Sequence, residues 1–192
     1  MTRNPYKLLE LNIILLDVEP TVWRRVLVPD HICFGQLADV ITTAMGWSGS
    51  HLHQFEAGQS VIGDYRDLES RPKTLSELDT SLHEIIDSRR KTFKFWYDFG
   101  DDWWHDITVE KRVPDDGLGI RILDGEHACP PEDCGGPPGY AEMLKVLADT
   151  SHPEHESTKQ WLGRRPFDPT RFVLEETQKA LDEAMGLNLR GK

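Results

Sequence analysis

The sequence predicts an α+β fold in which helices cover a mixed or antiparallel sheet. Apolar residues alternate with period two in the first two thirds of the chain and recur at helical spacing toward the C-terminus. The regular alternation of strands and helices that a doubly wound parallel sheet requires is missing from this pattern. We therefore expect N-terminal and central hairpins packed by one N-terminal helix and by C-terminal helices.

The chain length indicates a single domain. With 192 residues, 38% of them hydrophobic, the chain is long and apolar enough to bury one core. We expect residues 1–192 to form one domain, with a sheet-rich core over 6–125 that includes a helix at 34–46. The C-terminal helical part is expected over 139–186.

The N-terminal segments predict a hairpin followed by a helix. Residues 7–18 and 22–29 show strand alternation, and Pro20 lies in the break between them. Apolar residues then recur at helical spacing over 34–45, and Gly46 follows as a helix stop. The helix is expected to pack on the hairpin.

The middle of the chain predicts a short strand, a connection and a second hairpin. Residues 51–57 alternate, whereas 58–91 favour a mostly exposed connection with a small helix that starts near Thr74 or Ser76. Residues 91–113 form the clearest hairpin, with a turn at 100–102. One face of this hairpin is expected to carry the apolar residues Phe93, Phe95, Tyr97, Phe99, Trp103, His105, Ile107 and Val109.

The last third predicts one more strand and three helices. Residues 121–123 favour a strand, and the Pro- and Gly-rich segment 125–139 favours an irregular loop. The second of the three helices is expected to begin with a capping box made by Ser151 and Glu154, and to end at Gly163.

Charge and the N-terminal sequence exclude several classes of function. The 22 basic and 33 acidic residues give a net charge of −11, which argues against a broad electrostatic surface for nucleic acid or anionic lipid. The apolar run 11–16 is too short to cross a bilayer, and the start lacks a signal-peptide pattern. Three cysteines fit a reducing compartment, so we expect a cytoplasmic protein without a membrane partner.

Acidic residues gather at the turn of the second hairpin. Asp98, Asp101 and Asp102 can bind a divalent cation or a basic group, because clustered carboxylates repel one another unless a positive charge joins them. Asp is also a preferred turn residue, and this structural reading is favoured. Trp103 and His105 continue the apolar face, where a histidine is typically hydrogen-bonded inside a core.

A pair of histidines gives the main alternative. His51 and His53 are two residues apart on a predicted strand, a spacing that can chelate a transition metal if His105 or Asp98 supplies a third ligand. Packing of both rings beside Phe55 and the tryptophans is the favoured interpretation. We accordingly expect neither a metal ion nor a cofactor.

The cysteine-containing loop favours a binding surface over a catalytic site. Cys129 and Cys134 lack the spacing and the second ligand pair of a zinc site, so Glu132 and Asp133 are expected on the exposed rim of a pocket. The sequence contains no G-x-S-x-G, P-loop, dinucleotide-binding or H-E-x-x-H motif. The basic groups Arg24-Arg25, Arg89-Arg90-Lys91 and Arg164-Arg165, interleaved with tryptophans, leave weak nucleic-acid binding as an alternative.

Several motifs together resemble the plasmid pRiA-type ORF-3-like family over about residues 6–181. They are VWRRVLVP, MGW followed by HLHQF, YDFGDDWWHDITVE, CPPEDCGGPPGY and WLGRRPFDPTRF. The resemblance implies a compact α+β domain associated with mobile elements, and some members carry the label TnpR. That label implies a resolvase, but Ser48, Ser50 and Ser60 lack the surrounding arginines, and Tyr140 lacks the Arg/His/Arg setting, that recombinases need.

These observations favour a non-catalytic binding or adaptor module for a protein or peptide. Its surface is expected to include His51, His53, Asp98, Asp101, Asp102, Trp103, His105, Glu132 and Asp133. One alternative is a metal-dependent hydrolase or nuclease that uses the histidines and nearby acids. The other alternative is a weak nucleic-acid-binding protein.

Overall fold

The computed structural model describes residues 6–63, 74–163 and 166–189, and confirms the α+β class. One eight-stranded sheet has the order β5-β4-β3-β6-β7-β1-β2-β8, and every neighbouring pair is antiparallel except β4 and β5. The strands are β1 (Lys7–Leu15), β2 (Trp23–Pro29), β3 (His53–Ala57), β4 (Ser60–Gly63), β5 (Thr74–Ser76), β6 (Thr92–Tyr97), β7 (Trp103–Pro114) and β8 (Arg121–Glu126). The helices are α1 (Phe34–Met45), α2 (Leu82–Ile85), α3 (Gly136–Ala148), α4 (His155–Leu162) and α5 (Leu174–Leu189).

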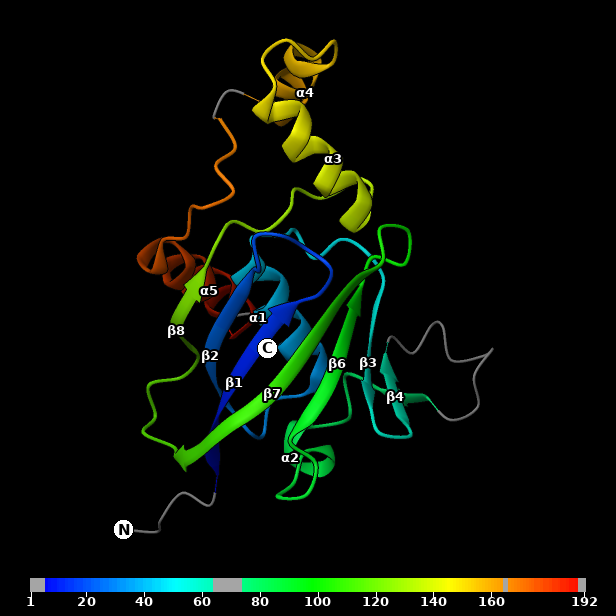
Figure 1. The fold of residues 1–192 in the computed structure, drawn as a ribbon. Helices are drawn as coiled ribbons and strands as arrows, with labels where there is room; N and C mark the ends of the chain where they lie inside the picture. The colour runs from blue at the N-terminus through cyan, green and yellow to red at the C-terminus, as the bar shows by residue number, and fades with distance from the viewer. Residues whose placement is uncertain (1–5, 64–73, 164–165, 190–192) are drawn as a thin grey trace.

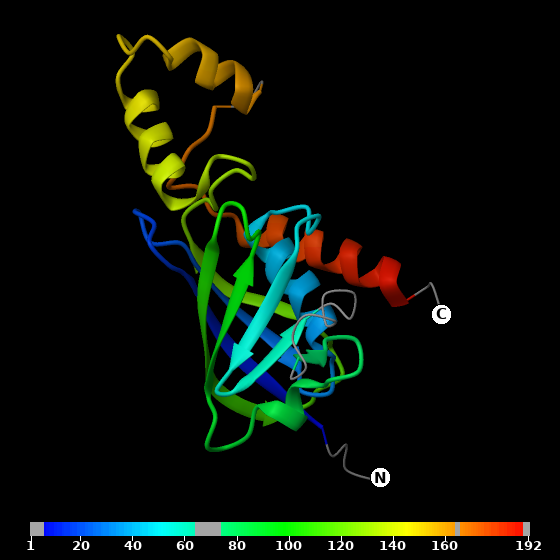
Figure 2. The ribbon, with the colours of Figure 1, turned by 90° about the vertical axis from the view of Figure 1, so that its right-hand side faces the viewer.

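The helices occupy two regions around the sheet. α1 and α5 lie against the same face, whereas α3 and α4 extend beyond one end of the strands (Figures 1 and 2). No helix within the described ranges is long and apolar enough to cross a lipid bilayer. The core therefore lies between the sheet and α1, and Tyr140 and Met143 of α3 extend it.

Both predicted hairpins are confirmed, and they join through β1 and β7 at the centre of the sheet. β1 pairs with β2 from Leu8 opposite Pro29 to Ile14 opposite Trp23. β6 pairs with β7 from Thr92 opposite Thr108 to Tyr97 opposite Trp103. Because side chains alternate along a strand, one face of this sheet presents a continuous apolar surface to α1.

Helix α1 forms where its sequence pattern predicts it. Cys33 is its N-cap: the Sγ atom accepts a hydrogen bond from the backbone N–H of Gln36, whose side chain accepts from the Cys33 N–H. Gly46 ends the helix with a φ of 92°, a left-handed conformation that glycine adopts without steric cost. Phe34 packs edge-on against Phe55 at 5.0 Å and Phe93 at 6.1 Å, which fixes the helix on the sheet.

Arg24 connects the helix layer to the chain that follows β8. Its guanidinium is buried and donates hydrogen bonds to four backbone carbonyl groups, those of Trp23, Ala44, Glu126 and His127. Phe172 covers it at 4.4 Å. Burial lowers the pKa of Arg24, but the carbonyl dipoles compensate the charge in place of a carboxylate.

Helix α5 covers the outer edge of β8. The side-chain Oε1 of Gln178 accepts a hydrogen bond from the backbone N–H of Ile122 at 2.9 Å. Its Nε2 donates to the backbone oxygen of Ile120 at 3.3 Å. A single side-chain amide thereby satisfies a donor on β8 and an acceptor directly before it, on the side where no other described strand pairs with β8.

The connection predicted over 58–91 is partly wrong, because it contains strands β4 and β5. These two strands are short, so an alternation signal scarcely develops in them. The small helix begins at Leu82 with Ser81 as N-cap, rather than near Thr74 or Ser76. The part of this connection over 64–73, and the Arg164-Arg165 pair, lie outside the described residues.

Other local predictions also require correction. Phe99 does not continue the core face of β6, because it lies past the strand and packs against Trp96 at 4.4 Å. Ser151 hydrogen-bonds to Asp149 rather than capping α4, which starts after Glu154. α3 begins within the segment predicted to be irregular, because two prolines occupy its first positions.

Candidate functional site

Three connections meet at the end of the sheet from which α3 projects. They are the segment 46–52 between α1 and β3, the turn 98–102 between β6 and β7, and the loop 127–135 between β8 and α3 (Figure 1). Six of the nine predicted site residues lie on these connections: His51, Asp98, Asp101, Asp102, Glu132 and Asp133. β3 and β6 are neighbours in the sheet, whereas β8 lies at its far edge. The loop 127–135 is joined to the other two connections by hydrogen bonds to Trp47, Ser48 and Tyr97.

Trp47 joins the three connections to the core. Its indole stacks on Tyr97 at 4.9 Å and meets the ring of His105 edge-on at 5.5 Å. The Nε1–H donates to the backbone oxygen of Pro130 at 2.9 Å. This single buried side chain therefore sets the position of the loop 127–135 relative to β6 and β7.

Glu132 is held by three donors. The hydroxyl of Tyr97 donates to Oε1 at 2.6 Å, the hydroxyl of Ser48 donates to the same oxygen at 3.1 Å, and the backbone N–H of Ser48 donates to Oε2 at 3.0 Å. Burial alone would raise the pKa of Glu132, but these hydrogen bonds outweigh it and lower the pKa. Burial, together with the hydrogen bond to the Glu132 carboxylate, raises the pKa of Tyr97. Glu132 is thus an ionised, fixed carboxylate.

The turn 98–102 is shaped by its own aspartates. Asp98 and Asp102 have positive φ values of 54° and 62°, a conformation that Asp tolerates better than most residues. Asp102 accepts a hydrogen bond from the indole N–H of Trp104 at 2.8 Å. Asp101 accepts from the backbone N–H of Gly135 at 3.2 Å, so it ties the turn to the start of α3.

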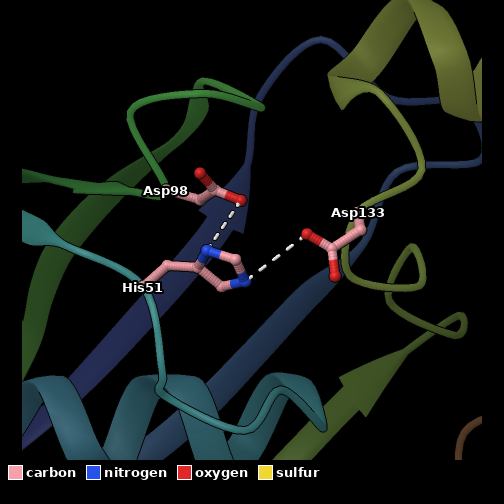
Figure 3. Close-up of side chains that lie close together, drawn as sticks. All are labelled: His51, Asp98 and Asp133. Carbon is pink, nitrogen blue, oxygen red and sulfur yellow. Dashed lines mark ion pairs between the residues drawn. The ribbon is translucent and has the colours of Figure 1, made fainter.

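His51 lies between Asp98 and Asp133 (Figure 3). Its Nδ1 is 3.3 Å from Oδ2 of Asp98, and its Nε2 is 3.7 Å from Oδ1 of Asp133. Asp98 is largely buried, with Oδ1 accepting the N–H groups of Gly100 and Asp101, so its other oxygen is left to face His51. Asp133 is 75% exposed and stands at the outer side of the cluster.

The structure does not bring His53 and His105 to this cluster. Nε2 of His53 is 3.0 Å from Glu77. Burial alone would lower the pKa of His53, but the hydrogen bond and the charge of Glu77 outweigh it and raise the pKa. His105 is fully buried and donates from Nδ1 to the backbone oxygen of Phe95 at 3.2 Å, and Trp103 is equally buried beside it. The three predicted histidines therefore occupy three separate environments.

Arg24 and Arg25, two of the basic residues noted in the sequence, have structural contacts, and two of the cysteines are protonated thiols. Arg25 pairs with Glu110 at 2.9 Å, whereas Arg24 is buried. Burial raises the pKa of the Cys129 thiol and raises that of Cys134 to about 12, so both are protonated thiols at neutral pH. All three cysteines of the chain are free.

A groove opens next to the cluster, beneath α4. Its volume is about 680 Å³, and we call it the α4 groove. Its walls are the chain around Trp47, the loop 128–133 and the segment 166–171, with Trp161 and Leu162 from α4. Trp161, which is 51% exposed, and Asp133 also line a second cavity of about 480 Å³ between α3 and α4.

The sequence interpretation did not single out Trp47, Ser48 or Trp161 as site residues. Their positions depend on how loops separated by about 80 residues meet, as in the hydrogen bond from Trp47 to Pro130. The one available signal was local. Trp47 directly follows the helix stop at Gly46, where an apolar residue commonly packs back on the preceding helix.

Comparison with known proteins places this architecture among its relatives. Residues 7–176 match the family of plasmid pRiA4b ORF-3-like proteins. The chain is 38% identical over 175 residues to the uncharacterized protein y4hQ of Sinorhizobium fredii, covering 90% of each chain. It is also similar to the crystal structure of the protein of unknown function MM3350 from Methanosarcina mazei Go1, with a TM-score of 0.81, 34% identity, and coverage of 89% of this chain and 97% of the other. By sequence along most of its length and by fold, the chain belongs to the plasmid pRiA4b ORF-3-like family.

Proposed function

We propose that the protein is a non-catalytic, cytoplasmic binding module whose α4 groove takes a cationic segment of a partner protein. The supporting observation is the charge of the groove. Glu132, Asp133 and Asp168 contribute carboxylates, whereas Arg171, the only basic residue among the described lining residues, is paired with Glu176 at 2.7 Å. An arginine or lysine side chain entering the groove therefore meets more acidic than basic side chains.

The exposed aromatic ring on α4 supports the same ligand chemistry. Trp161 offers an indole face to a guanidinium or ammonium group, and Leu162 and Phe167 offer apolar surface to the neighbouring side chain. Enriched aromatic residues next to charge are typical of surfaces that bind peptides. Free thiols at Cys33, Cys129 and Cys134 fit a reducing cytoplasm.

The test uses two labelled hexapeptides, one alternating arginine with leucine and the other alternating glutamate with leucine. We expect saturable binding of the basic peptide by fluorescence anisotropy, weakening as NaCl is raised, and no binding of the acidic peptide. Trp161→Ala should weaken binding about tenfold, the loss expected when a favourable cation–π contact is removed. Asp168→Asn, in which the amide oxygen can still accept from Thr170, should weaken it by a smaller factor.

The control is Asp116→Asn, in the connection between β7 and β8 at the opposite end of the sheet (Figure 1). This variant should bind the basic peptide as the unmodified protein does. Equal binding of both peptides, or unchanged binding in Trp161→Ala, would contradict the proposal. Absence of binding to either peptide at millimolar concentration would contradict it as well.

A further inference from the structure

We propose that His51, Asp98 and Asp133 form a binding site for a divalent transition-metal ion. One ligand atom from each residue can be chosen so that all three lie within 4.8 Å of one another. Within residues 6–63, 74–163 and 166–189 this is the only group of three or more His, Cys, Asp or Glu residues that meets this condition. The proposal concerns an ion and not a peptide, although the site shares Asp133 with the α4 groove.

The donor set determines the class of ion. One imidazole nitrogen with two carboxylate oxygens suits Zn²⁺, Mn²⁺, Co²⁺ or Fe²⁺, whereas Mg²⁺ and Ca²⁺ prefer ligand sets made of oxygen alone. Ligand atoms about 2.1 Å from a tetrahedral zinc ion are about 3.4 Å apart. His51 faces Asp98 with Nδ1 at 3.3 Å and Asp133 with Nε2 at 3.7 Å, and one ion binds only one of these nitrogens. One ring nitrogen and one oxygen from each carboxylate lie within 4.8 Å of one another, so coordination requires the ligand atoms to approach by up to about 1.4 Å.

Each ligand is held to a different degree. Asp98 is fixed by two backbone N–H groups, and the ring of His51 meets Tyr97 edge-on at 5.7 Å, so these two ligands are positioned before an ion arrives. Asp133 is 75% exposed and can move inward by the distance that coordination requires. Its exposure leaves the remaining coordination positions to water or to a group bound in the α4 groove, which Asp133 also lines.

The local charge also calls for a cation. Among the described residues, His51 is the only ion-pair partner of Asp98 and of Asp133. Glu132 adds a further negative charge close to His51, where it is already ionised through its bonds to Tyr97 and Ser48. A divalent ion would neutralise this convergence of carboxylates more completely than the imidazole can.

The left-handed backbone of both aspartates can be kept in variants that remove only the charge. Asn adopts positive φ as readily as Asp, so Asp98→Asn and Asp133→Asn should fold normally, at φ values of 54° and 60°. Asp102→Asn is the matched control, because Asp102 has the same conformation in the same turn but faces Trp104. His83→Gln, an exposed histidine on α2, is the control for His51→Gln.

The experiment titrates chelator-treated protein with Zn²⁺ against a chromophoric chelator, and with Co²⁺ for its visible spectrum. We expect one ion per chain, Co²⁺ bands without sulfur-to-metal charge transfer, and affinity reduced by at least about tenfold in His51→Gln, Asp98→Asn and Asp133→Asn. The two controls should bind as the unmodified protein does. Trp161→Ala should also leave metal affinity unchanged, which separates this site from peptide binding.

Three results would overturn the proposal. The first is a protein that shows no saturable binding of Zn²⁺ or Co²⁺. The second is binding that the three ligand variants leave unchanged, and the third is a sulfur charge-transfer band, which would assign the ion to Cys129 or Cys134 instead. If metal binding fails while the basic peptide still binds, only the metal site is contradicted.

Discussion

His105 shows how one buried side chain couples the core to the solvent pH. The ring is fully buried, and burial lowers its pKa to about 4 from an ordinary value of 6.5. Between these two values the unfolded chain binds a proton that the folded protein does not. The free energy of unfolding must therefore fall as the pH falls from about 6.5 to about 4, by about 3 kcal/mol from this residue.

The His105→Phe variant should lose this part of the pH dependence. We expect chemical denaturation of the unmodified protein to show stability falling through this pH range, and the variant to show a shallower fall. The exposed His83→Gln is the control and should follow the unmodified protein. If the curves of His105→Phe and the unmodified protein run parallel, the buried neutral imidazole is not the source of the effect. The His105 ring contacts Trp47 and Phe95, so the larger Phe side chain could disturb their packing. His105→Gln therefore provides a second, smaller replacement that also removes the titrating ring.

The location of His105 in the core was predictable from the sequence, whereas the place of His51 was not. His105 falls in a strict alternation with Trp103, Ile107 and Val109, so its face follows from the period of the strand. His51 lies in the connection before β3, so the alternation of a strand does not determine which way its side chain points. Its partners Asp98 and Asp133 come from two other connections. The sheet order places β3 beside β6, and hydrogen bonds from Trp47, Ser48 and Tyr97 hold the loop that carries Asp133 against them.

At the scale of elements, the contact between the turn 98–102 and α3 is very close. A Cβ atom on Gly136 would overlap the backbone oxygen of Asp101, and Gly136 has a φ of 68°. Asp101 in turn accepts the N–H of Gly135. The first turn of α3 is therefore seated directly on the hairpin, and only glycine permits that approach.

Gly136→Ala should consequently lower the free energy of unfolding by about 3 kcal/mol, through overpacking and an unfavourable φ. Denaturant titration measures this change. Gly186→Ala in α5 is the control, because no atom lies within 4 Å of the added Cβ. It should leave stability unchanged or raise it by up to about 1 kcal/mol, since alanine is the better helix former. A Gly136→Ala protein as stable as the unmodified chain would show that α3 is not anchored through this contact.

The elements themselves were predicted with uneven success, for physical reasons. α1 carries its own start and stop signals in Cys33, Gln36 and Gly46, and the structure confirms its limits. β4 and β5 are too short to show a clear alternation in sequence, and each forms on the edge of a neighbouring strand, β4 on β3 and β5 on β4. The start of α3 was missed because a proline-rich segment is typical of loops and of first helical turns alike.

At the scale of the whole molecule, stability should differ between the sheet and the α3–α4 arm. The central strands β1 and β7 are paired on both sides, and their core faces are buried. α4 contributes a single buried residue, His155, and lies beyond the end of the sheet (Figure 2). The free energy of local opening should therefore be much smaller for α4 than for β1.

Native-state hydrogen exchange measures this difference. We expect the amides of β1 and β7 to exchange only through global unfolding, and those of α4 to exchange at least about a hundredfold faster. α5 serves as an internal reference, because it packs on α1 and β8 and should be protected better than α4. Protection of α4 equal to that of β1 would show that the arm and the sheet unfold as one unit.

Gln178 has a consequence for self-association. Its amide acts like the peptide group of an adjacent strand, since it accepts a hydrogen bond from the N–H of Ile122 and donates one to the oxygen of Ile120. A bare β8 would offer these groups as a template on which a second molecule could add its own strand, the route by which sheets polymerise. A chain shortened before Leu174 would lose Gln178 with α5, and we expect it to leave this edge of β8 open to such pairing.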